Sequence, residues 1–108
     1  MKDELKDIKK MIDELLVLQD NYLAIIRYDI DYIISNEVVD DDKVAGIFDE
    51  LLSLLQTDEV LNLYKKLCRY YYFVNSELVV EYVDFYKEMY IDASIDSKVK
   101  EKNIFNDI

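Results

Sequence analysis

The side chains that could do chemistry in this sequence are carboxylates, because the usual catalytic bases, nucleophiles and zinc ligands are nearly absent. The chain has 24 acidic residues, no histidine and one cysteine, Cys68. Without histidine, the commonest general base and the commonest zinc ligand are missing, and one cysteine cannot build a thiolate cluster. The single glycine, Gly46, excludes a glycine-rich phosphate loop. We therefore expect no catalytic residue, no metal and no cofactor.

Two carboxylate sites for hard cations need consideration. A calcium loop that starts at Asp41 would have its glycine at Gly46, but Leu52 would stand where a bidentate glutamate is required, so this site fails. The pair Glu81-x-x-Asp84 resembles half of the magnesium motif of all-α nucleotide pyrophosphatases, and the facing pair of glutamates is missing. A magnesium-dependent carboxylate enzyme is therefore the weakest of the functions that we consider.

The carboxylates are densest between Tyr28 and Glu50. Eight acids and one base, Lys43, give this stretch a formal charge of −7 out of the total of −11. The acidic residues of this predicted patch are Asp29, Asp31, Glu37, Asp40, Asp41, Asp42, Asp49 and Glu50. Because the stretch joins the end of one predicted helix to the start of the next, we expect its carboxylates to lie near one another. Such a patch can dock on a surface rich in lysine and arginine, or mimic the phosphates of a nucleic acid; a solvated connector is the alternative.

The net charge also defines the class of partner. Direct binding to nucleic acid requires clustered lysine and arginine, and anionic membranes attract the same residues, so neither is expected. A protein with a basic surface, such as a nucleic-acid-binding protein or a nuclease, is the expected partner. In size, acidity and helicity the chain is similar to bacterial immunity proteins and phage anti-defence proteins. This resemblance implies an inhibitor that blocks a basic surface, and no residue is carried over from it.

Helices must position these side chains, because one glycine and no proline leave few tight turns for a sheet protein. We predict an all-α fold, a single-domain bundle of about four helices over residues 1–96, followed by a polar, loosely held tail over residues 97–108. The predicted helices cover residues 3–35, 43–56, 58–74 and 77–91. The helix over 58–74 has the widest apolar arc and should be the most enclosed.

The predicted helix over residues 3–35 is apolar on two sides. Its main stripe, interrupted only by Gln19, is expected to face the core. This stripe consists of Leu5, Ile8, Ile12, Leu15, Leu16, Tyr22, Leu23, Ile26, Ile30, Ile33 and Ile34. A second, narrower apolar row consists of Leu18, Ile25, Tyr28 and Tyr32. The row is either enclosed within the bundle or faces a second chain, so a homodimeric structural adaptor is the alternative function.

The residues at the helix starts and the tyrosines of the last two helices can also be assigned roles. Asp40 to Asp42 should open the second helix, Thr57 should cap the third and Ser76 the fourth. We interpret Tyr64, Tyr71, Tyr82, Tyr86 and Tyr90 as core residues whose hydroxyls reach the rim.

The expected location is the cytoplasm. The first residues lack the basic-then-apolar order of a signal peptide, and no apolar run reaches the ~20 residues that span a bilayer. A single cysteine suits a reducing compartment.

Overall fold

A computed structural model describes residues 2–91, with side chains from Glu4 onward. These residues form four helices and no strand: α1 (Lys2–Ser35), α2 (Asp41–Ser53), α3 (Asp58–Tyr71) and α4 (Ser76–Tyr90). The predicted all-α fold with a long first helix is confirmed. The predicted tail over residues 97–108 lies outside the described residues.

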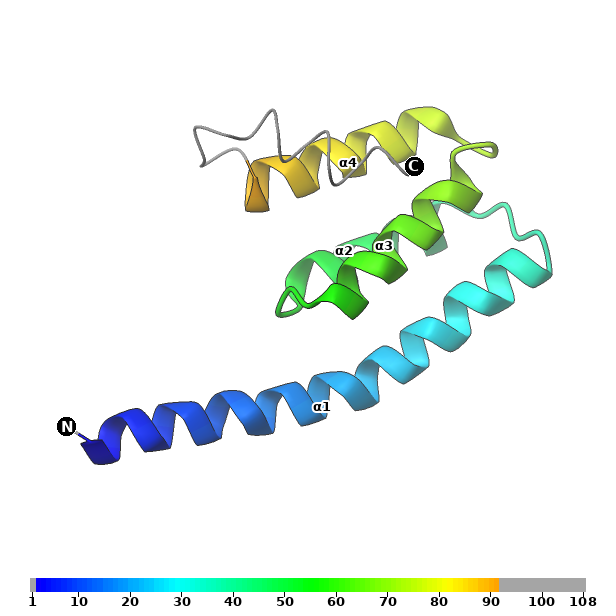
Figure 1. Cartoon of the computed structure of the whole chain (residues 1–108). Helices are drawn as coiled ribbons and strands as arrows, with labels where there is room; N and C mark the ends of the chain where they lie inside the picture. The colour runs from blue at the N-terminus through cyan, green and yellow to red at the C-terminus, as the bar shows by residue number, and fades with distance from the viewer. Residues whose placement is uncertain (1, 92–108) are drawn as a thin grey trace.

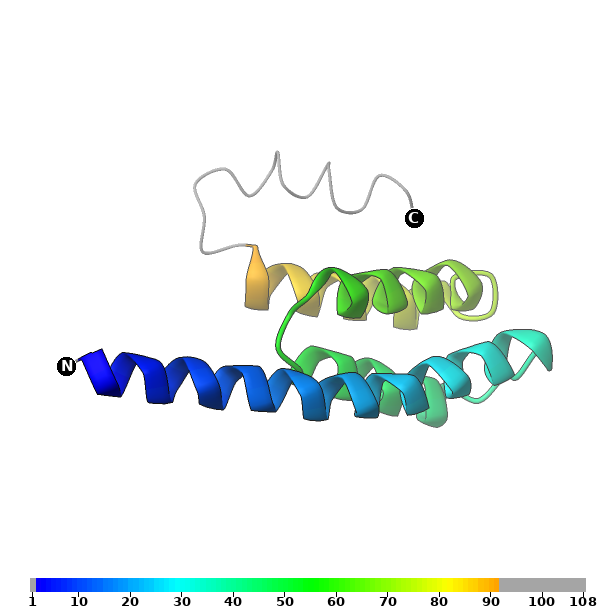
Figure 2. The ribbon, with the colours of Figure 1, turned by 60° about the horizontal axis from the view of Figure 1, so that its bottom comes forward.

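The three shorter helices form a body against which part of α1 packs. α2 packs on α3 and α4, while α1 packs mainly on α3. Figure 1 shows α1 extending past the other helices at its N-terminal end, and Figure 2 shows the same extension from another side. At ~1.5 Å per residue, α1 is about 51 Å long and the other helices are only about 20 Å long. The body therefore covers about half of α1.

The core is built from the C-terminal half of α1 and the inner faces of the other helices. From α1 come Leu23, Ile26, Ile30 and Ile33, all essentially inaccessible to water. The buried residues of α3 are more numerous than those of α2 or α4, as predicted. They are Val60, Leu63, Tyr64, Leu67, Cys68 and Tyr71.

The prediction that the main stripe of α1 faces the core along its whole length is wrong. Leu5, Ile8, Ile12 and Leu15 are 70%, 50%, 44% and 46% exposed. The stripe keeps its phase, but no body helix reaches far enough to cover its first half. We call residues 4–18 the arm, since α1 enters the body only at Gln19.

Side-chain caps begin three of the helices. The Asp40 carboxylate accepts the Lys43 N–H (3.2 Å), and the Thr57 hydroxyl oxygen accepts the Val60 N–H (3.3 Å), as predicted. The predicted cap of α4 is wrong by one residue: Asn75 Oδ1 accepts the Leu78 N–H (3.2 Å), and Ser76 is the first helical residue. Both residues can cap, and the chain enters the helix one position earlier than expected.

Tyrosine hydroxyls join the body helices. Tyr64 donates to the carbonyl oxygen of Tyr82 (2.5 Å), and Tyr90 donates to that of Leu52 (2.5 Å). Phe48 lies between the rings of Tyr64 and Tyr82, with both centroid distances at 4.9 Å. The interpretation as core residues is confirmed for Tyr64, Tyr71, Tyr82 and Tyr86, and it is wrong for Tyr90, which is 40% exposed.

None of the helices within residues 2–91 combines the length and the apolar character that crossing a bilayer requires.

Candidate functional site

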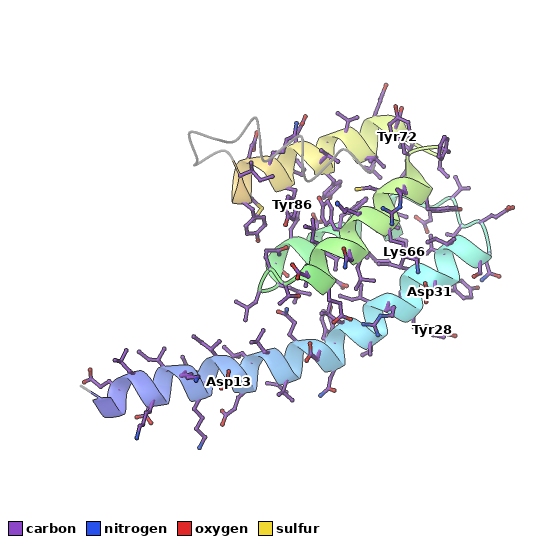
Figure 3. The ribbon with its side chains drawn as sticks, viewed as in Figure 1. Asp13, Tyr28, Asp31, Lys66, Tyr72 and Tyr86 are labelled. Atoms are coloured by element: carbon purple, nitrogen blue, oxygen red, sulfur yellow. The ribbon has the colours of Figure 1, made fainter. Side chains whose placement is uncertain are left out.

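The acids of the predicted patch lie beside several different neighbours. Asp31 forms an ion pair with Lys66 of α3 (2.7 Å), and Figure 3 shows these two side chains facing one another. Glu50 and Asp29 instead lie near Tyr22, on the side of α1 that adjoins α2. Burial raises the pKa of Tyr22, and so do a hydrogen bond to Glu50 and the charges of Glu50 and Asp29.

Three further acids of the patch hold the body together. Asp40 caps α2. Asp41 accepts hydrogen bonds from the Tyr71 hydroxyl and from Asn75 Nδ2 (3.0 Å for the latter). Asp49 accepts the hydroxyl of Tyr82 (2.9 Å).

The tyrosines that donate to these acids have raised pKa values and so stay protonated. Burial, followed by the hydrogen bond to Asp49, raises the pKa of Tyr82 to about 12. Burial and the bond to Asp41 raise the pKa of Tyr71 as well. Their hydroxyls therefore remain donors at neutral pH. Glu37 and Asp42 are exposed, so the eight acids are a mixture of fold-supporting and solvent-facing groups.

A more continuous acidic surface lies on the outer face of α4. Its four exposed acids recur at intervals of four, three and four residues, which places them on one face of the helix over about 16 Å. We call this the α4 ridge: Glu77, Glu81, Asp84 and Glu88. Of these four residues, the sequence drew attention only to Glu81 and Asp84, as half of a magnesium motif, and the ridge was not among the predicted binding residues.

A shallow, open depression of about 450 Å³ adjoins the α4 ridge. Its lining combines three carboxylates with an aromatic and an aliphatic side chain. The residues are Tyr72, Ser76, Glu77, Val80, Glu81 and Asp84. Tyr72 is 47% exposed and stacks edge-to-face with Phe73, which is 89% exposed.

The predicted third helix over residues 58–74 would carry Tyr72 on its wide apolar arc, and the exposure of Tyr72 shows that this placement is wrong. α3 ends at Tyr71, so Tyr72 and Phe73 belong to the turn into α4 rather than to the helical face. The signal available in the sequence was the run of four aromatics at residues 70–73, followed by Val74 and then by Asn75-Ser76, where a helix is expected to stop.

The apolar row of α1 is open to solvent. Leu18, Ile25, Tyr28 and Tyr32 are 65%, 59%, 70% and 48% exposed. Figure 3 shows Tyr28 directed away from the other helices. The body therefore does not enclose the row. Of the two sequence interpretations, the one in which the row faces a second chain requires this exposure.

The described residues offer little for covalent or metal chemistry. No group of three or more His, Cys, Asp or Glu side chains among them could hold a metal ion. Cys68 is buried, and burial raises the pKa of its thiol to about 12, so the thiolate that would act as a nucleophile is suppressed. The candidate surfaces in the described part of the chain are the α4 ridge with its depression and the outer side of α1.

Comparison of the chain with models of known families, with curated proteins and with solved structures finds no match.

Proposed function

We propose that this chain is a non-catalytic protein-binding module that occupies a basic surface of a target protein, as an inhibitor or an immunity-type protein does. The observation that carries the proposal is the depression beside the α4 ridge, where Tyr72 and Val80 stand among three carboxylates. A lysine or arginine side chain of a partner fits this combination. The aromatic face attracts the cation, and the carboxylates accept its hydrogen bonds.

Exposed aromatics support a binding role for the same end of the molecule. Tyr72 and Phe73 are large exposed aromatic side chains, and Tyr72 lies beside three carboxylates, a composition common at binding hot spots. The hydrogen bond from Asn75 to Asp41 brings the acidic start of α2 to the start of α4. Acids from the two helices therefore contribute to one negatively charged end, which speeds association with basic surfaces.

The test is a pulldown from the source lysate with the purified chain, repeated with two charge variants. Glu81→Lys with Asp84→Lys reverses the ridge, while Asp13→Lys with Glu14→Lys makes the same change in charge on the arm. We expect a basic protein to bind the wild-type chain and the arm variant, to be lost from the ridge variant, and to elute at high salt because screening weakens exposed charge contacts.

A second pair of variants separates the depression from general electrostatics. Tyr72→Ala leaves every charge in place and should weaken binding of the captured protein at least tenfold if the ring is an anchor. Tyr28→Ala, which truncates a more exposed tyrosine on α1, should leave the affinity unchanged. Equal capture by the ridge and arm variants, or equal affinity of the two tyrosine variants, would contradict the proposed site.

A further inference from the structure

The exposed side of α1 has a regular spacing that the narrow apolar row alone does not show. From Ile8 onward, exposed apolar residues follow one another at alternating intervals of three and four. They are Ile8, Met11, Leu15, Leu18, Tyr22 and Ile25. The same spacing continues to Asp29 and Tyr32, of which only Asp29 is polar. We call this set the α1 seam. Alternation of three and four is the heptad pattern with which two helices pack along their length.

The α1 seam is too large to be ordinary surface. It spans 25 residues, about 36 Å, and at the width of a helix it forms a strip of roughly several hundred Å². Its apolar members are between 39% and 65% exposed. Contiguous apolar patches of this size on one chain mark interaction sites.

Charge distinguishes between the occupants that such a seam could take. Residues 6–10 of the arm carry three lysines and one aspartate, whereas residues 29–42 carry six acids and no base. A second copy of the chain placed antiparallel brings this lysine cluster, within an arm whose net charge is −1, against the end of the other α1 that carries Asp29 and Asp31. A parallel copy would place the two acidic ends together.

We propose that the α1 seam binds a second copy of this chain, with the two α1 helices antiparallel. A two-fold axis near Asp20 gives a self-complementary contact in which residue numbers on facing positions sum to about 40. Leu15 of each copy then faces Ile25 of the other, and Leu18 faces Tyr22. The arm of each copy lies along the body of the other, which covers the part of α1 that its own body leaves open.

Asp29 gives the arrangement its register. It occupies the one polar position of the seam and is half-buried. In the proposed pairing it faces Met11 of the second copy, one residue from Lys10. A polar group at a single seam position, next to one cation, fixes the alignment of two helices that apolar contacts alone would allow to slide.

The first experiment measures the mass of the full chain in solution by light scattering at tens of micromolar. We expect twice the chain mass of 12.9 kDa. Leu18→Glu with Ile25→Glu should give the monomer mass. Val17→Glu is the matched control: Val17 is 62% exposed beside Leu18 but lies off the seam, so this variant should remain a dimer. Protection of Cys68 from thiol reagents verifies that each variant is folded.

The second experiment tests the direction of the helices. A spin label at Asp7→Cys, with Cys68 buried and unreactive, should report a separation of about 40 Å between the two labels of an antiparallel dimer. Two parallel helices would hold the labels about 10 Å apart. A monomeric wild-type chain, a dimer that survives Leu18→Glu with Ile25→Glu, or a short label distance would each overturn the proposal.

The dimer is independent of the proposed binding of a basic target. Glu81→Lys with Asp84→Lys should abolish capture of the target and leave the dimer mass unchanged. Leu18→Glu with Ile25→Glu should do the reverse. Failure of one proposal therefore leaves the other intact.

Discussion

Gln19 and Leu55 exchange two hydrogen bonds across 36 residues of chain. Gln19 Nε2 donates to the Leu55 carbonyl oxygen, and the Leu55 N–H donates to Gln19 Oε1, both at 2.8 Å. Gln19 is the only buried polar side chain in the part of the chain whose burial is described. Its position is where α1 leaves the body, so this pair fastens α1 to the connection between α2 and α3.

Replacing Gln19 with leucine should lower the free energy of unfolding by about 2 kcal/mol, because it leaves two backbone groups of Leu55 without their partners. Urea denaturation followed by circular dichroism measures the change. Asn62→Leu, which makes the same replacement at an exposed amide on α3, should alter stability by less than about 0.5 kcal/mol. Equal effects of the two substitutions would show that the Gln19 pair contributes nothing.

Stability should fall at alkaline pH, and Tyr82 should account for part of the fall. The pKa of Tyr82 is raised to about 12 in the folded chain, from an ordinary value near 10. Because the folded state holds this proton more tightly, the contribution is fully present below pH 10 and is lost as pH rises from 10 to 12. Tyr82→Phe should flatten this part of the stability curve measured by urea denaturation. Tyr28→Phe should leave the curve as in the wild type.

Glu37→Gly should stabilise the chain by about 1 kcal/mol. Glu37 follows the end of α1 with φ of 52°, in the left-handed region where a side chain costs energy and glycine does not. The backbone around it closes the helix end through the Val38 N–H bond to the Ile33 carbonyl oxygen (3.0 Å). Glu37→Ala keeps the Cβ atom and should give no gain. Thermal melts of both variants measure the change in stability. A gain in stability with Glu37→Ala would contradict the explanation from backbone conformation.

Gly46→Ala should also stabilise the chain by about 1 kcal/mol, since Gly46 lies inside α2 and an added Cβ meets no atom within 4 Å. The reverse change at an exposed helical alanine, Ala24→Gly, should cost a similar amount. Chemical denaturation of both variants gives the comparison. A loss of stability in Gly46→Ala would indicate that another chain approaches this face of α2 in solution.

The positions of the helices could be predicted from the periodicity of apolar residues, but the length over which the helices pack on one another could not. The apolar stripe of α1 has one phase from Leu5 to Ile33, so the helix was predictable over its whole length. Whether a stripe is covered depends on the length of the helices beside it. α2 ends at Ser53 and α3 begins at Asp58, and these two ends leave the arm uncovered.

The interaction surfaces were only partly predictable for a similar reason. The acids around Asp41 are dense in the sequence, but Tyr71 and Asn75 reach them through contacts 30 and 34 residues away. Gln19 looked like a flaw in the stripe because its partner, the backbone of Leu55, has no sequence signature. The α4 ridge was visible as a charged face, whereas the depression beside it depends on how Tyr72 leaves α3.

The arm has a mechanical consequence. Glu4 lies about 22 Å along α1 from Gln19, so a tilt of about 10° at Gln19 would displace the tip by about 4 Å. In such a tilt the arm would turn about the pair of hydrogen bonds between Gln19 and Leu55. A molecule that binds the tip would exert a torque on the α2–α3 connection. Conversely, a small rearrangement of that connection would move the tip by a much larger distance.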